Sequence, residues 1–319
     1  MELIIKPTGR CNFACTFCSA NPLKIAHPQS VPDPIKNIIN ILKPNGIVCT
    51  GGEPLLVPKE YYEELLTLGD FTLGFTSNLK AFYENPEYWT PLLTNPRVSI
   101  GTSFQYGTKR RWDANTVYTE EKFIEVQEVV KKYLGHTVPF IAIIDEENEQ
   151  YALDHLRLAK RLDTQCKLNP MRSMGLSHNN YPYYKMIDIW KKAKEEGLWD
   201  YIDCEIQNYK GGCGWNTSLY CESTIRACYV DENGQFHFSN CEDYLSCGGE
   251  IPVDKESPKP KEENISVFDA INNNCLSCDL YRLCNGCKIS REANKKDPNF
   301  CEEMLKRKDY IMGQGWKLY

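Results

Sequence analysis

The sequence lacks the features that mark membrane-spanning and exported proteins. Its 319 residues contain no apolar run of about eighteen residues, the minimum for a membrane-spanning helix. The first residues show no signal-peptide pattern and lead directly into a cysteine-rich loop. Basic residues are not in excess, because 37 Lys and Arg stand against 43 Asp and Glu, for a net charge of -6. We therefore expect a cytoplasmic protein without membrane or nucleic-acid partners, and we expect the basic run at residues 109–111 to be solvated surface.

Histidine is also scarce, with five residues, whereas cysteine is abundant, with sixteen. A large chain without an export signal is not a secreted disulfide scaffold. The large number of thiols therefore indicates metal binding. The first three, Cys11, Cys15 and Cys18, are separated by four and three positions and follow a short apolar run. Three thiolates on one loop can bind three irons of a [4Fe-4S] cluster and leave the fourth iron open. The spacing alone is also compatible with part of a zinc site, but the nearest histidine is His27.

A second motif begins about thirty residues later. An apolar run ending at Cys49 is followed by Thr50, Gly51, Gly52, Glu53 and Pro54. Glycines allow close approach of a ligand to the backbone, and a carboxylate can accept hydrogen bonds from a cationic amine. On its own this pattern is weak support for a binding site.

Together, the cysteine triplet and the Thr-Gly-Gly-Glu-Pro run resemble the radical S-adenosylmethionine (radical SAM) superfamily. The resemblance implies that Cys11, Cys15 and Cys18 ligate a [4Fe-4S] cluster whose open iron chelates the amino and carboxylate groups of S-adenosyl-L-methionine. It also implies reductive cleavage to a 5'-deoxyadenosyl radical that abstracts a substrate hydrogen, with an electron donor such as flavodoxin or ferredoxin. By the same resemblance, Phe17 lies near the adenine. The methionyl ammonium is received by Gly51, Gly52 and Glu53.

Short apolar runs alternate with helical patterns over roughly the first half of the chain. The predicted strands are residues 3–6, 46–50, 71–76, 98–103, 138–144 and 166–169. The predicted helices are residues 34–42, 61–68, 87–93, 119–133 and 149–161. Six strand-helix units predict an α/β fold, a partial (β/α)6 TIM-like barrel whose chemistry gathers where strands end in loops.

Polar side chains follow several of these strands. By the resemblance, Ser77, Asn78 and Ser103 are candidates for ribose or carboxylate contacts, and Asn169 and Arg172 for adenine or carboxylate contacts. Residues of these types at strand ends serve equally often as caps and turns. The assignment therefore depends on where the structure places them.

The composition changes near residue 200, so we expect a barrel domain at residues 1–200 and a cysteine-rich domain at 201–319. Residues 204–301 hold eleven of the sixteen cysteines, and metal must substitute for a small apolar core there. A hairpin is predicted from residues 228–230 and 235–238, with Gly234 in its turn. Eight thiols make two sets of four, which by spacing alone could bind two zinc ions or two iron-sulfur clusters.

The order of these eight cysteines resembles the SPASM extension of radical SAM enzymes. The resemblance assigns the first auxiliary [4Fe-4S] cluster to Cys221, Cys228, Cys241 and Cys287. It assigns the second to Cys275, Cys278, Cys284 and Cys301, which makes three clusters per chain. Two residues rather than three separate Cys284 from Cys287, and six rather than four follow Gly234 before Cys241. Cys213 or Cys247 could therefore replace an assigned ligand, or an auxiliary cluster could have an open iron.

Three further cysteines are outside the assigned ligand sets. Cys49 and Cys166 lie in strand patterns and are expected to be buried apolar side chains. Cys213 lies in a Gly-Gly-Cys-Gly-Trp turn. Its thiol is a candidate hydrogen donor to a substrate radical, although an ordinary loop cysteine is as good an interpretation.

The sequence thus predicts a radical SAM enzyme with a SPASM-like extension that modifies a peptide or protein by crosslinking, oxidation or epimerisation. Only ten residues precede Cys11, so we expect such a peptide to dock on the barrel or the cysteine-rich part, or through a separate partner. The alternative is a radical SAM dehydrogenase or related enzyme acting on a small molecule such as a sugar alcohol or amine. A non-enzymatic alternative is a zinc-stabilised interaction module.

Overall fold

The computed structural model describes residues 2–18, 20, 23–171, 176–177, 181, 183–202 and 225–239, with single positions beyond residue 300. Several residues singled out by the sequence lie outside the described residues. They are Arg172, Cys213, Cys221, Cys241, Cys247, Cys275, Cys278, Cys284, Cys287 and Cys301. The roles predicted for them stay predictions.

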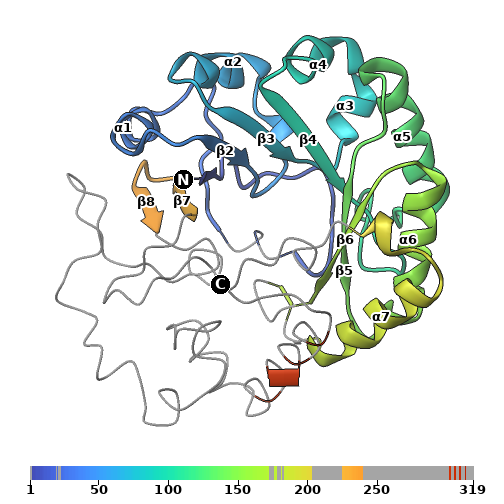
Figure 1. Cartoon of the computed structure of the whole chain (residues 1–319). Coiled ribbons are helices and arrows are strands. Elements are labelled where there is room, and N and C mark those ends of the chain that lie inside the picture. The colour runs from blue at the N-terminus through green and yellow to red at the C-terminus, as the bar shows by residue number, and fades with distance from the viewer. Residues whose placement is uncertain are drawn as a thin grey trace, which may run out of the picture.

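The described chain forms an α/β fold built on one curved sheet, as the sequence predicts. Six parallel strands stand in the order β6-β5-β4-β3-β2-β1. Their bounds are β1 (Glu2–Ile5), β2 (Gly46–Cys49), β3 (Thr72–Thr76), β4 (Val98–Ser103), β5 (Phe140–Ile144) and β6 (Cys166–Pro170). Helices cover the convex side of the sheet (Figure 1), which is the arrangement of a partial barrel.

In the described residues up to 202, seven α-helices accompany the strands, and two of them, α3 and α7, have no counterpart in the sequence prediction. The bounds are α1 (Asp33–Leu42), α2 (Lys59–Thr67), α3 (Lys80–Glu84), α4 (Pro86–Leu93), α5 (Glu120–Leu134), α6 (Ala152–Arg161) and α7 (Tyr183–Glu195). Within the described part of the chain, no helix combines the length and the apolar character that crossing a lipid bilayer requires.

Helix α5 shows how local sequence sets the boundaries of an element. The Thr119 side chain accepts a hydrogen bond from the Lys122 backbone N–H and so satisfies a free donor at the helix start. Gly135 ends the helix in the left-handed conformation, at φ 85°. Between these caps, Phe123, Val126 and Val130 lie on one face and are fully buried.

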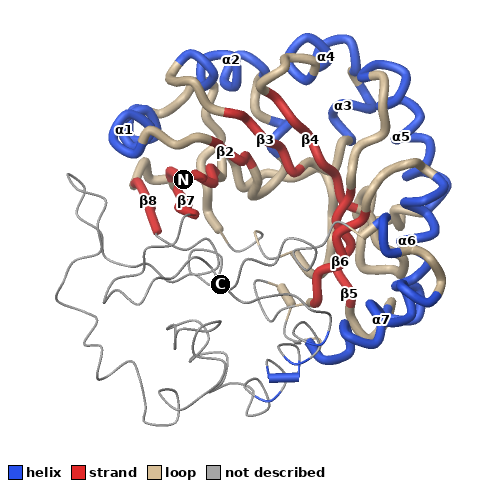
Figure 2. The backbone as a smooth tube through the Cα atoms, in the orientation of Figure 1, coloured by secondary structure: helices blue, strands red, loops and turns tan. Residues whose placement is uncertain are grey.

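The core lies between the sheet and the helices, because alternate residues of each strand point to that side. In β5 the buried residues are Phe140, Ala142 and Ile144, while Ile141 and Ile143 between them are partly exposed. Figure 2 shows the strands on the inside of the helical layer. The less buried strand residues therefore face the concave side, where a barrel enzyme places its substrate.

The predicted hairpin is present as β7 (Ile225–Val230) and β8 (Phe236–Ser239), with Gly234 at φ 79° in its turn. Strand β7 also pairs in parallel with β1, so the hairpin extends the barrel sheet beyond β1. The sequence did not predict this pairing. A division at residue 200 stays a prediction, since this part of the second segment shares the sheet of the first.

Candidate metal and cofactor site

The cysteine loop follows β1 at the carboxyl end of the sheet. Cys11 is exposed, and Cys15 and Cys18 are partly exposed. Cys49 and Cys166 are fully buried in the apolar core, which confirms the sequence prediction for both. Of these five cysteines, only the three on the loop are accessible.

The two glycines of the second motif hold this loop. The Gly52 N–H donates to the Thr8 carbonyl at 2.9 Å, and the Glu53 N–H donates to the Arg10 carbonyl at 2.7 Å. A Cβ atom at Gly52 would lie 2.2 Å from the Arg10 carbonyl oxygen, and Gly51 adopts φ +116°. Only glycine permits this approach. The contact that requires Gly52 is with the backbone of the cysteine loop, whereas the sequence suggested a ligand.

A second segment holds the loop from the other side. The Ala14 N–H donates to the Arg111 carbonyl at 3.1 Å, and the Thr16 N–H donates to the Lys109 carbonyl at 3.0 Å. These two bonds flank Cys15. The backbone of the loop is thus fixed between the turn after β2 and the segment after β4.

Glu53 joins the second motif to the end of β3. Its buried carboxylate, 1 % exposed, accepts hydrogen bonds from Ser77 Oγ at 2.6 Å, the Asn78 N–H at 2.7 Å and the Leu55 N–H at 3.0 Å. The sequence suggested Glu53 as an acceptor for an ammonium group. In the structure the carboxylate accepts hydrogen bonds from three donors of the protein itself. It therefore connects the turn after β2 to the end of β3.

Burial raises the pKa of Glu53 to about 7, while its three hydrogen bonds act in the opposite direction. A folded-state pKa above the usual 4.5 means that folding favours the protonated form. The stabilising effect is therefore complete below pH 4.5 and is lost as the pH rises through 7. We expect the unfolding free energy of Glu53→Gln relative to the natural protein to rise by about 2 to 3 kcal/mol between pH 5 and pH 8.

Chemical denaturation of the protein without added S-adenosylmethionine at the two pH values checks this expectation. Glu84→Gln is the matched control, because it makes the same substitution at an exposed position. A difference for Glu53→Gln that does not change between the two pH values would contradict the pH dependence assigned to Glu53.

Asn78 connects the end of β3 to the cysteine loop. Its side-chain Nδ2 donates to Asn12 Oδ1 at 2.8 Å and lies 3.6 Å from Cys11 Sγ. The Phe13 N–H also donates to Cys11 Sγ, at 3.4 Å. N–H groups directed at sulfur stabilise a thiolate and are the outer contacts that a metal-bound cysteine needs. The structure thus brings Asn78 to the cysteine loop and Ser77 to Glu53 through protein contacts. The predicted contacts of both residues with the ribose or carboxylate stay predictions.

Arg110 is the site residue that sequence reasoning missed. Its guanidinium lies 5.2 Å from the centre of the Phe17 ring, and Nη1 donates to Ser103 Oγ at 2.8 Å. Arg110 is only 7 % exposed, and its Nε has no hydrogen-bond partner among the residues that the structure describes. The expectation of a solvated basic run is therefore wrong for this residue. A buried cation with an unused donor can bind an anionic group of a ligand.

Asn169 lies on a different strand from the site residues described above. It lies in β6, which ends the run of six parallel strands opposite β1, and it pairs in register with Ile143. Its predicted partner Arg172 is outside the described residues. The predicted contact of this pair with the adenine or carboxylate therefore stays a prediction.

The thiols of the loop fit a [4Fe-4S] cluster by their chemistry. Cys11 lies within electrostatic reach of Cys15 and Cys18. Each thiolate of such a cluster binds a different iron, so three thiols on one loop can hold three of its four irons.

Comparisons with known proteins give a family match for part of the chain and a fold. Residues 5–159 match the family described as the Radical SAM superfamily. Native anSMEcpe with bound AdoMet (S-adenosylmethionine) and the Cp18Cys peptide is 18% identical, with a TM-score of 0.68, covering 98% of this chain and 97% of that chain. Streptococcus suis SuiB bound to the precursor peptide SuiA is 15% identical, with a TM-score of 0.62 and coverages of 90% and 72%. No curated protein sequence matches the chain.

Proposed function

We propose, from the match of residues 5–159 to the Radical SAM superfamily, that the enzyme cleaves S-adenosylmethionine reductively and abstracts hydrogen from a peptide or protein substrate. The observation that carries the proposal is the loop of three accessible thiols held between the Gly51-Gly52-Glu53 turn and the segment after β4. When bound there, a [4Fe-4S] cluster and S-adenosylmethionine would supply a 5'-deoxyadenosyl radical. The protein must hold both groups and keep solvent away from the radical.

The chain's own residues divide this work. Cys11, Cys15 and Cys18 would hold the cluster, and the N–H groups near Cys11 would stabilise its thiolate. Ser103 and Arg110 would receive the carboxylate of S-adenosylmethionine, because Arg110 is a buried cation with a free donor.

This assignment of Arg110 has a measurable consequence. Glutamine keeps a polar side chain but removes the charge, so Arg110→Gln should raise the KM for S-adenosylmethionine about tenfold or more, as expected for one charge-assisted contact. The measurement is 5'-deoxyadenosine formation at varied S-adenosylmethionine concentration under anaerobic reduction.

Arg111→Gln is the matched control, since Arg111 is the next residue and is only partly buried. It should leave the KM within about twofold of the natural enzyme, as exposed charges contribute little. An equal effect of both substitutions, or none from Arg110→Gln, would remove Arg110 from the cofactor site.

The peptide substrate is supported by the two structural relatives. The anSMEcpe structure contains the Cp18Cys peptide, and SuiB is bound to the precursor peptide SuiA. We propose that this enzyme also acts on a peptide, by crosslinking, oxidation or epimerisation.

The test incubates the anaerobically prepared enzyme with reductant, S-adenosylmethionine and candidate substrates, and measures substrate-dependent 5'-deoxyadenosine. Peptides encoded beside the gene should stimulate its formation and change in mass or stereochemistry. Turnover of a sugar alcohol or amine, with no turnover of any such peptide, would favour a small-molecule enzyme and overturn this proposal.

We further propose the two auxiliary clusters that the eight later cysteines imply. Of these eight, only Cys228 is described, and it is buried in β7 within the apolar cluster that contains Ile5, Cys49 and Phe238. Its role as a ligand would place the first auxiliary cluster directly against this core. Iron analysis separates the possibilities, since three clusters hold about twelve irons per chain and one holds about four.

A further inference from the structure

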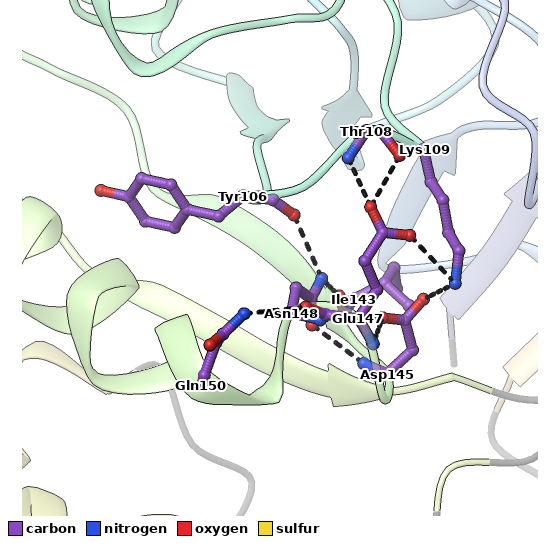
Figure 3. A network of polar contacts seen from close by, with 8 residues as sticks. All are labelled: Tyr106, Thr108, Lys109, Ile143, Asp145, Glu147, Asn148 and Gln150. Atoms are coloured by element: carbon purple, nitrogen blue, oxygen red, sulfur yellow. Dashed lines mark hydrogen bonds and ion pairs between the residues drawn. The ribbon is translucent and has the colours of Figure 1, made fainter.

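A polar network joins the loop after β5 to the segment after β4 (Figure 3). Asp145 directly follows β5, and Lys109 lies in the segment after β4. Lys109 Nζ lies 2.5 Å from Asp145 Oδ2 and 3.5 Å from Glu147 Oε2. The Asp145 side chain is almost completely buried. A buried carboxylate needs such a partner, so this ion pair constrains its two segments more than a surface pair would.

Hydrogen bonds add further attachments between the same two segments. Glu147 Oε1 accepts from both the N–H and the Oγ1 of Thr108, each at 2.7 Å. The Tyr106 N–H donates at 3.1 Å to Nε2 of His155, which is buried in the following helix α6. Gly107, between Tyr106 and Thr108, adopts φ +101°. Residues 106–109 are thus fixed at several positions against the loop after β5 and helix α6.

The loop after β5 also has a rigid geometry of its own. Asp145 Oδ1 accepts from the N–H groups of Glu147 and Asn148 at 2.9 and 3.2 Å. Asn148 Oδ1 accepts from the Asp145 N–H at 2.9 Å, and its Nδ2 donates to the Ile143 carbonyl at 2.8 Å. The carboxylates that bind the neighbouring segment are therefore held in place by the backbone around them.

The fixed segment is the one that holds the cysteine loop. The Lys109 and Arg111 carbonyls accept the two hydrogen bonds that flank Cys15. Arg110, between them, carries the guanidinium that contacts Ser103 and Phe17. A displacement of residues 108–111 would therefore move the backbone at Cys15 and the guanidinium together.

We propose that Lys109, Asp145 and Glu147 are positioning residues that set the placement of the cysteine loop and of Arg110 for S-adenosylmethionine binding. This proposal rests on the proposed function for its catalytic consequence. Its structural part, control of the loop by the network after β5, concerns only this chain's own residues. The two parts can therefore be tested separately.

The test compares amide hydrogen exchange in the anaerobically prepared holoenzyme. Glu147→Ala removes both contacts to Thr108, and exchange in the peptide containing Ala14 and Thr16 should accelerate about tenfold, as expected when local opening becomes easier. Glu149→Ala is the matched control, because Glu149 lies two residues further in the same loop and pairs with Lys185 and Tyr181 instead. It should leave exchange of that peptide unchanged. Glu147→Gln keeps an acceptor for Thr108 and should restore most of the protection.

A second readout concerns the cofactor. Glu147→Ala should raise the KM for S-adenosylmethionine at least about fivefold, with a smaller change in kcat, whereas a general loss of folded enzyme would lower kcat alone. Unchanged exchange around Cys15 in Glu147→Ala, or equal acceleration in Glu149→Ala, would overturn the proposal. Faster exchange without any S-adenosylmethionine cleavage by the natural enzyme would instead refute the proposed function and leave the network's control of the loop standing.

Discussion

Cys15→Ala is expected to abolish S-adenosylmethionine cleavage and to lower the metal content by about four irons and four sulfides per chain. Cys15 lies on the loop between the two backbone hydrogen bonds donated by Ala14 and Thr16. Without its thiolate, one iron loses its only protein ligand. The other described cysteines outside the loop are buried and cannot replace it. Iron and sulfide analysis and 5'-deoxyadenosine formation measure the two effects.

Cys166→Ala provides the matched control. Cys166 is also a cysteine, but it is fully buried in β6. Its replacement should cost about 1 kcal/mol of stability through a small cavity and should leave iron content and cleavage unchanged. Full activity of Cys15→Ala, or an equal loss of iron from both variants, would contradict the assignment of the cluster to the loop.

Among the glycines that the structure describes, Gly52 is the one where a change to alanine should have the largest effect. The new Cβ would lie 2.2 Å from the Arg10 carbonyl oxygen and 2.7 Å from the Gly9 carbonyl carbon, both backbone atoms that cannot rotate away. The backbone of the cysteine loop must then move away from Gly52. We expect a loss of about 3 kcal/mol of stability, at the upper end of overpacking effects, together with loss of the cluster.

Gly74→Ala is the corresponding control within β3. A Cβ there would meet its nearest neighbours, Ser99 and Val48, at 3.5 Å, which is ordinary van der Waals contact. Thermal unfolding and iron analysis of both variants make the comparison. Equal stability and iron content in the two variants would show that the close approach at Gly52 does not hold the cysteine loop in place.

Local sequence was sufficient to predict the six strands of the barrel and helix α5. Each strand is a short apolar run, and α5 has a capping threonine, a spaced apolar face and a terminal glycine. The parallel pairing of β7 with β1 was not predictable in this way. It joins residues 2–5 to residues 225–228, and no local pattern specifies a partner so distant in sequence.

Like the fold, the candidate metal and cofactor site was predictable from the sequence only in part. The spacing of Cys11, Cys15 and Cys18 located the loop, and the Gly-Gly-Glu run was interpreted as a site for a ligand. Its hydrogen bonds to the cysteine loop were not predicted. The buried position of Arg110 was missed, because it depends on the segment after β4 folding back against the cysteine loop. A basic residue seven positions after Ser103 was the only available signal, and the neighbouring Lys109 and Arg111 made it resemble ordinary surface.

The role of Glu53 also needed the structure. The sequence identifies an acid beside two glycines but not the three donors that occupy its carboxylate. Those donors come from its own turn and from the end of β3. Their convergence is set by the packing of neighbouring parallel strands.

The central claim is that one iron at this loop has no protein ligand and binds S-adenosylmethionine directly. Electron-nuclear double resonance of the reduced holoenzyme, with S-adenosylmethionine carrying 15N in its amino group and 17O in its carboxylate, tests this claim most directly. The account predicts hyperfine coupling of both labels to the cluster, and loss of that signal in Cys15→Ala. A reduced cluster that shows no coupling to either label at saturating S-adenosylmethionine would contradict it.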